Sequence, residues 1–186
     1  MLKIIFKHLK TICKHKAIVC LECMKCGFIW RGLMHDNSKF GLAEFLPSAK
    51  YFEGNKNTEK VRNGYYLAWL HHKGHNPHHW EYWIEFDREG KVIANKIPYE
   101  YVVEMVCDWI GAGMVYSKDK WTQGQPLMYY KIVRRGQHFH PETEALIIKF
   151  LECIRDKGLK EFHKMARTAQ KSYLNAVCNT SCDKGR

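Results

Sequence analysis

One short stretch of the chain places polar side chains that could do chemistry inside an apolar segment. Residues 30–45 read WRGLMHDNSKFGLAEF, in which His35, Asp36 and Lys39 are surrounded by aromatic and aliphatic side chains. Polar groups in such surroundings are costly to bury unless they are paired, hydrogen-bonded or bound to a metal. In one interpretation Asp36 or Asn37 caps a helix and Lys39 lies in solvent. In the other interpretation His35 and Asp36 are metal ligands.

The other histidines favour the metal interpretation. Five of the eleven fall within residues 71–79, which read HHKGHNPHH. His8 and His15 share nearly the same face of a predicted helix, and His15 points inward. A lone inward histidine is usually a hydrogen-bonded core residue, but this chain offers a series of donors in the order His15, His35, Asp36, His71, His72 and Asp108. Mixed imidazole and carboxylate donors suit Mn, Fe, Zn, Ni or Co better than an ion that prefers oxygen alone.

The order of these residues resembles the HD-domain superfamily of metal-dependent phosphohydrolases. Proteins of that superfamily are helical and carry the order H…HD…D, and many have a lysine three residues after the aspartate, which is Lys39 here. His71 and His72 resemble the double histidine that opens the HHExxDGxGYP segment of the HD-GYP branch. The segments HDNSKF and HHKGHNPHHWEYW are most similar to a poorly characterised family of bacterial and phage proteins with HDxSKF and HHKxxNxHHxEYW signatures.

This resemblance implies one or two divalent transition metal ions and hydrolysis of a small phosphate ester, such as a nucleotide. It places metal ligands at His15, His35, Asp36, His71, His72 and Asp108. Asp36, Lys39 and His72 would be catalytic, and Lys39 would also hold a phosphate oxygen of the substrate. The sequence departs from the family pattern at Ser38, where glycine is common. It also lacks the DGxGYP tail, which argues against a cyclic-dinucleotide enzyme.

The residues that follow the double histidine have several possible roles. His78 and His79 could be ligands, could bond to carboxylates that orient ligands, or could line the mouth of a substrate site. Trp80 could stack on a base, although aromatic side chains in helical proteins belong to the core more often. We predict that His78, His79 and Trp80 bind substrate. Glu44 is predicted to be a solvated helix residue.

A second cluster of potential ligands lies near the N-terminus. The segment CLECMKC spaces Cys20, Cys23 and Cys26 in a pattern that can hold an iron–sulfur cluster or zinc, with Cys178 or Cys182 as a fourth thiolate. A regular helix would spread the first three thiols over more than one face. Free cysteines also pack well as small apolar side chains. The packing interpretation is therefore favoured.

The charge of the chain favours a phosphorylated or polyanionic partner. Its 30 Lys and Arg exceed its 19 Asp and Glu, and the formal net charge is +11 at pH 7. No block of like charges marks a nucleic-acid tail, although nucleic-acid binding stays open. No uncharged apolar run reaches the roughly 18 residues of a membrane span, and lysines interrupt the N-terminal segment too often for a signal peptide. The sequence thus predicts a cytoplasmic protein with reduced cysteines and no membrane contact, and leaves its oligomeric state open.

The elements that must position these residues are mostly helices. Helical periodicity is clearest over residues 2–28, 99–116 and 142–158. Further helices are predicted to begin near Asn37 and to span residues 63–72 and 160–177, with loops at 52–60 and 117–126. Residues 83–97 alternate apolar and polar side chains around residues 87–90, which predicts a small hairpin or ordered loop. We expect one mostly α-helical HD-like domain over residues 1–186, of which 117–186 form a C-terminal helical extension.

Two alternative functions remain open from the sequence. A few HD-type proteins use similar ligands for oxygen-dependent cleavage at a di-iron centre. A basic helical protein could instead bind nucleic acid without catalysis, and its histidines would then form a structural metal site. Steep salt dependence of nucleic-acid binding would favour this last alternative.

Overall fold

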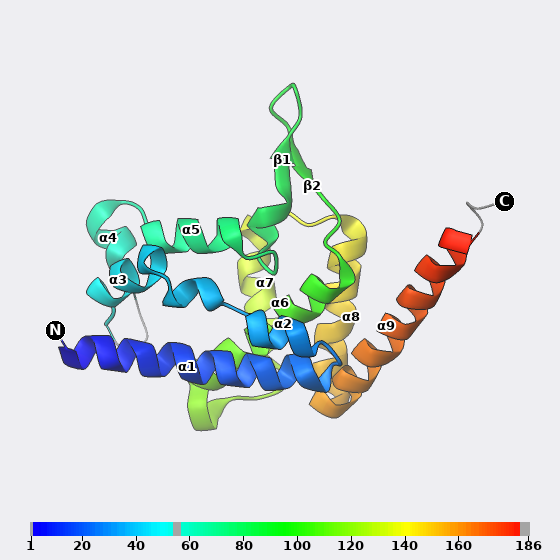
Figure 1. Cartoon of the computed structure of the whole chain (residues 1–186), viewed down its shortest axis with the longest axis horizontal. Helices are drawn as coiled ribbons and strands as arrows, with labels where there is room; N and C mark the ends of the chain where they lie inside the picture. The colour runs from blue at the N-terminus through cyan, green and yellow to red at the C-terminus, as the bar shows by residue number, and fades with distance from the viewer. Residues whose placement is uncertain (1, 54–56, 183–186) are drawn as a thin grey trace.

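The computed structural model describes residues 2–53 and 57–182, with the side chains of the last helix described as far as Gln170. The mostly α-helical fold with a small hairpin is confirmed (Figure 1). The α-helices are α1 (Leu2–Lys25), α2 (Ile29–Met34), α3 (Leu42–Lys50), α4 (Glu59–Asn63), α5 (Leu67–His75), α6 (Tyr99–Ser117), α7 (Gln125–Val133), α8 (Pro141–Lys157) and α9 (Leu159–Cys182). Short 3₁₀ turns cover Asn37–Phe40, Trp80–Trp83, Lys118–Lys120 and Arg134–Gly136. Within these described ranges we find no helix with the length and apolar character that a membrane crossing requires.

Helix α6 runs through the middle of the hydrophobic core. Several of its apolar side chains, among them Val102, Val106 and Ile110, are fully buried. It packs against α1 and α2 on one side and against α7 and α8 on another, while α3 lies along α1 and α5 along α3 (Figure 1). The N-terminal half of the chain thus forms one layer over α6, and α7 and α8 form another.

Two glycines allow neighbouring helices to approach α1 closely. A β-carbon at Gly111 of α6 would lie 2.5 Å from Cγ2 of Val19, and one at Gly32 of α2 would lie 2.8 Å from a backbone oxygen of α1. Neither distance leaves room for a side chain, so only glycine fits at these positions. His15 lies one turn from Val19, and Asp108 lies one turn from Gly111. The close contact therefore brings the turns that carry His15 and Asp108 together.

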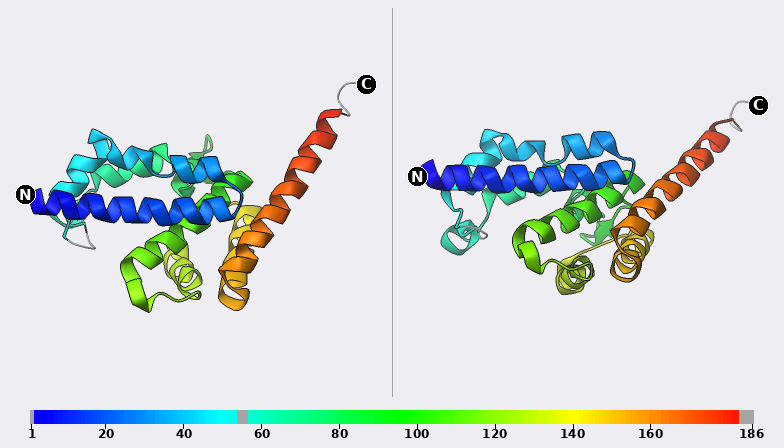
Figure 2. Two further views of the ribbon diagram at one scale, coloured as in Figure 1. Left: turned by 60° about the horizontal axis from the view of Figure 1, so that its bottom comes forward. Right: turned by 90° about the horizontal axis from the view of Figure 1, so that it is seen from below.

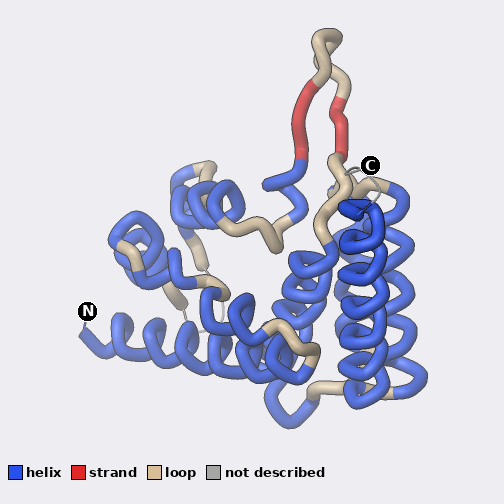
Figure 3. The backbone as a smooth tube through the Cα atoms, turned by 45° about the vertical axis from the view of Figure 1, so that its right-hand side comes forward, coloured by secondary structure: helices blue, strands red, loops and turns tan. Residues whose placement is uncertain are grey.

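A hairpin near the middle of the chain and the last helix project from the helical body. Strands β1 (Ile84–Phe86) and β2 (Val92–Ala94) pair antiparallel and form a hairpin that stands away from the helices (Figure 3). The first turns of α9 pack against α8, after which α9 runs away from the body (Figure 2). The Tyr99 hydroxyl donates to the carbonyl of Ala166 over 2.8 Å, which holds this first part of α9 in place.

The structure corrects several predicted boundaries. Helices α2 and α7 were not predicted, and α7 begins inside the predicted loop 117–126. Helix α5 begins later than predicted and continues past residue 72 to His75. Helix α4 begins within the predicted loop 52–60. Each missed helix has fewer than ten residues, so its apolar positions repeat too few times to form a recognisable period.

Candidate metal centre

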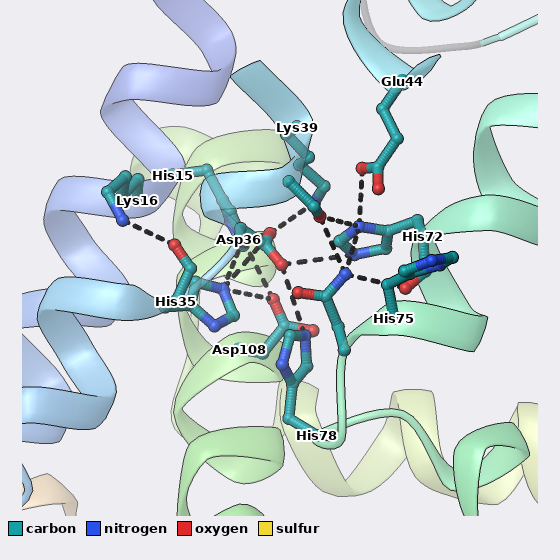
Figure 4. A network of polar contacts seen from close by, with 12 residues as sticks. His15, Lys16, His35, Asp36, Lys39, Glu44, His72, His75, His78 and Asp108 are labelled. Atoms are coloured by element: carbon teal, nitrogen blue, oxygen red, sulfur yellow. Dashed lines mark hydrogen bonds and ion pairs between the residues drawn. The ribbon is translucent and has the colours of Figure 1, made fainter. Parts of the chain in front are cut away.

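The carboxylate of Asp36 lies at the centre of a buried cluster of imidazoles (Figure 4). Its Oδ2 atom is 3.5 Å from Nε2 of His15 and 3.3 Å from Nε2 of His35. Its Oδ1 atom is 3.2 Å from Nε2 of His72 and 3.4 Å from Nε2 of His78. The two oxygens of one carboxylate therefore face two different sets of nitrogens.

Two groups of potential metal ligands share Asp36, and the donor atoms within each group lie within 4.8 Å of one another. The first group consists of His15, His35, Asp36 and Asp108, and the second of Asp36, His72, His78 and His79. Oδ1 of Asp108 is 2.9 Å from Nε2 of His15, which closes the first group. Each group could hold one metal ion. A carboxylate shared in this way can bridge two ions.

The backbone around Asp36 explains how two adjacent residues reach one centre. Neighbouring residues in a regular helix point about 100° apart, but the chain leaves α2 at His35, and Asp36 adopts the left-handed conformation with φ 55° and ψ 23°. This conformation costs a non-glycine residue roughly 1–2 kcal/mol, and aspartate tolerates it better than most. Nζ of Lys16 fixes the turn to α1 by donating to the carbonyls of Leu33 and His35 over 2.9 and 2.6 Å.

Two buried glutamates orient three of the imidazoles. Oε1 of Glu104 lies 2.9 Å from Nδ1 of His35 and 3.1 Å from Nδ1 of His78. Oε2 of Glu44 lies 2.8 Å from Nδ1 of His72. An imidazole that donates Nδ1–H to a carboxylate presents the lone pair of Nε2 at its other end, which is the form that binds a metal. In all three residues that Nε2 atom is the one that faces the shared carboxylate.

Several buried atoms of the cluster fit a metal because they have no hydrogen-bond partner within the described part of the chain. They are Oδ1 of Asp36 and the Nε2 atoms of His72, His78 and His79. A buried polar atom without a partner costs about 1–3 kcal/mol, and coordination to an ion would remove that cost. The Nε2 atoms of His15 and His35 lie 3.4 Å apart, a spacing compatible with two ligands of one ion. The donor set therefore fits a divalent transition metal.

The electrostatics of the cluster keep its carboxylates ionised. Burial favours the neutral acid at Asp36, but the charges of His35 and Lys39 hold its pKa well below the ordinary value. Burial acts in the same direction at Glu104, but hydrogen bonds from His35 and His78 lower its pKa to about 2. Burial favours neutral His35, whereas Asp36 raises its pKa well above the ordinary value, so an incoming ion would displace a proton there.

Two residues predicted from the sequence lie apart from the donor groups. Nδ1 of His71 is 2.8 Å from Oε1 of Glu44, and its ring stacks on His75 with centroids 3.9 Å apart. Adjacent residues of α5 point in different directions, so His72 reaches Asp36 and His71 does not. The ring of Trp80 lies 5.8 Å from that of His138 and packs against the hydrophobic core.

Four positions, two of glutamate and two of histidine, differ from the sequence-based interpretation. The prediction that Glu44 is solvated is wrong, because this residue is only 2 % exposed. Glu104 was not identified as a candidate site residue from the sequence. It precedes Asp108 by four residues in an apolar helix and therefore lies on the same face of that helix. His78 and His79 were predicted to bind substrate, with metal ligation as an alternative, and the structure places both in the second donor group.

Two cavities meet at the cluster. One measures about 280 Å³ and the other about 490 Å³, and both are lined by His15, Lys39, Trp69 and Tyr116. Nζ of Lys39 is 2.5 Å from Oδ2 of Asp36. Burial favours the neutral amine at Lys39, but Asp36 raises its pKa above the ordinary value, so its side chain is an ammonium ion. This charge lies where a phosphate could approach from either cavity.

Two of the three cysteines of the CLECMKC segment belong to the core. Cys23 and Cys26 are fully buried, and Sγ of Cys26 lies 4.0 Å from Sγ of Cys107. Cys20 contacts the sulfur of Met24 instead. No potential metal-binding group within the described side chains contains a cysteine. The side chains of Cys178 and Cys182 lie outside the described residues.

Comparison with known proteins identifies a family without an assigned activity. The model of the "Family of unknown function (DUF5662)" matches residues 4–153. No curated protein and no solved structure matches the chain. The matched region contains every residue of both donor groups.

Proposed function

The chain belongs to DUF5662, a family of unknown function, and we propose from its buried donor cluster that it is a cytoplasmic, metal-dependent phosphohydrolase. Its substrate would be a nucleotide or another small phosphate ester. The observation that carries the proposal is the position of Asp36 between two buried sets of imidazoles. The order H…HD…D, which resembles HD-domain phosphohydrolases, supports it. The free thiols of the described cysteines suit a reducing cytoplasm.

Each residue of the cluster has a defined part in the proposed chemistry. When bound, Mn, Fe, Ni, Co or Zn ions would supply a water of lowered pKa and positive charge for the phosphoryl oxygens. Asp36 would hold both ions, while Glu44 and Glu104 keep the imidazoles in their binding orientation. The Lys39 ammonium would contact a non-bridging phosphate oxygen as a compact charge. The rings of Trp69 and Tyr116 would limit the access of bulk water.

The substitution Asp36→Asn tests the proposal directly. Asparagine tolerates the left-handed backbone, so the fold should be kept, but its amide cannot bridge two cations as a carboxylate does. Protein purified without a histidine tag should contain one or two transition metal ions per chain, and the variant should lose at least one of them. Hydrolysis of p-nitrophenyl phosphate by the metal-loaded protein should fall by more than about 100-fold.

The matched control is Lys39→Ala, which should keep the metal content and lower kcat/KM. Wild-type turnover in Asp36→Asn, or a wild-type protein that takes up no metal on titration, would rule the proposal out. Iron content with O₂ uptake and no phosphate release would identify the di-iron oxygenase instead. Salt-dependent nucleic-acid binding that Asp36→Asn leaves unchanged would favour the non-enzymatic alternative.

A further inference from the structure

His8 is a buried histidine that the proposed chemistry does not use. It lies on α1, two turns before His15, and is 8 % exposed. Among the residues that the structure describes, neither of its ring nitrogens has a hydrogen-bond partner. Most buried polar side chains in native proteins are hydrogen-bonded, so a histidine with two unpartnered nitrogens requires a physical explanation.

The surroundings of His8 make it a neutral group. Its ring centroid is 4.8 Å from that of Phe52 and 5.5 Å from that of Phe45. Burial, together with the positive charge of Lys39, lowers the pKa of His8. A neutral imidazole has one nitrogen that donates and one that accepts a hydrogen bond. His8 can therefore bind an uncharged polar group but offers no charge to an anion.

His8 lines the cavity of about 280 Å³ that reaches the donor cluster. The same cavity is also lined by residues that carry hydroxyl and amide groups, namely Thr11, Ser48, Asn57 and Tyr66. The hydroxyls of Ser48 and Tyr66 lie 3.4 Å apart. Lys39 and His72 line the same cavity at the metal centre. A phosphate held by Lys39 could therefore extend its ester group toward His8.

We propose that this cavity binds the hydroxylated, sugar-like part of a phosphate ester and that His8 selects it by hydrogen bonding to its hydroxyl groups. The inference rests on the proposed function, because it takes the phosphate to be held at Lys39. A hydroxyl both donates and accepts, as neutral His8 does. The aromatic walls match the apolar C–H faces of such a group, as in ligand pockets that combine apolar walls with a few polar contacts.

Equilibrium binding of non-hydrolysable phosphonates tests this inference without turnover. The probes are methylphosphonate, benzylphosphonate and the phosphonate analogue of ribose 5-phosphate, titrated calorimetrically into the manganese-loaded full chain. The ribose analogue should bind at least about 10-fold more tightly than the other two, because only it satisfies the polar groups of the cavity. His8→Phe should remove this preference while metal content and methylphosphonate affinity stay unchanged. His8→Gln, which keeps a donor and an acceptor, should retain part of it.

A control variant and the outcomes that would contradict the inference complete the test. His138→Phe changes an exposed histidine outside this cavity and should leave all three affinities unchanged. Equal binding of the ribose and benzyl compounds, or a ribose preference that survives His8→Phe, would overturn the inference alone. A metal-loaded protein that binds none of the three phosphonates would overturn the proposed function and this inference with it.

Discussion

At the scale of single residues, Glu104 is a side chain that contacts both donor groups. One of its oxygens bonds to His35 of the first group and to His78 of the second. The carboxylate is 4 % exposed and has Arg31 at 3.9 Å from its other oxygen. The orientation of one imidazole in each group thus depends on the same side chain, so the two groups should not bind metal independently.

The substitution Glu104→Gln should weaken both metal sites together. An amide keeps the shape but is a weaker acceptor for Nδ1–H, and loss of such an orienting partner typically reduces metal affinity about 10–100-fold. Competition with a chelator would measure both affinities. Glu44→Gln is the matched control, because His72 is the one imidazole of the two donor groups that Glu44 contacts, so this variant should weaken only the second group. An effect of Glu104→Gln confined to one ion would contradict the shared role.

Part of the site could be predicted from the sequence. The structure brings His15, His35, Asp36 and Asp108 together, as their order along the chain indicated. The choice between His71 and His72 depends on the rotation of α5, which the sequence does not specify. Glu44 resembles a solvated helix residue in the sequence, and only its packing against α5 shows which side chains it meets.

At the scale of elements, the contact between α1 and α6 sets the geometry of the first donor group. Gly111 of α6 permits the close approach to Val19 of α1. Val19 lies one turn from His15, and Gly111 lies one turn from Asp108. The 2.9 Å separation between these two donors depends on this helix spacing. The long helices α1, α6 and α8 were predictable because their apolar positions repeat over several turns. The turn that places Asp36 was not, since it depends on backbone angles.

Gly111→Ala should therefore separate α1 from α6. Crowding of a well-packed core costs about 1–3 kcal/mol of unfolding free energy, which urea denaturation would measure. Metal affinity of the first group should fall more than that of the second. Gly74→Ala in α5 is the control, because a β-carbon there meets no atom of the described residues within 4 Å and should not destabilise the protein. Equal changes in metal affinity in the two variants would show that the spacing between α1 and α6 does not control the site.

At the scale of the whole molecule, a buried hydrogen bond joins the first and last helices. Glu22 of α1 is 3 % exposed, and its Oε2 atom lies 2.7 Å from Nε2 of His163 on α9. Its Oε1 atom lies 2.7 Å from Nζ of Lys25. The hydrogen bond between Glu22 and His163 connects residues far apart in sequence and holds the start of α9 to the helix that carries His15.

Glu22 should make stability depend on pH. Burial favours its neutral acid, but hydrogen bonds from His163 and Lys25 lower its pKa below the ordinary 4.5. A lowered pKa contributes stability above about pH 4.5 that is lost as the pH falls through the folded-state value. Glu22→Gln should therefore destabilise the protein by about 1–3 kcal/mol at pH 7. Urea unfolding should show that the difference in unfolding free energy between the wild type and this variant is smaller at pH 4 than at pH 7.

The exposed Glu161→Gln provides the control for this pH dependence. It should leave the unfolding free energy nearly unchanged at both pH values, because a solvated side chain contributes little. If the effect of Glu22→Gln were the same at pH 7 and pH 4, ionisation of Glu22 would not be its cause.

The dispersed origin of the donors has a consequence for folding. They come from α1, the turn after α2, α5 with the segment that follows it, and α6, so the cluster exists only once these segments have docked. Bringing such distant parts of a chain together costs loop-closure entropy before any ligand bond can form. A metal that binds only the assembled cluster stabilises the native state by mass action. If the cluster forms after the folding transition state, the ion lengthens the lifetime of the folded chain without speeding its formation.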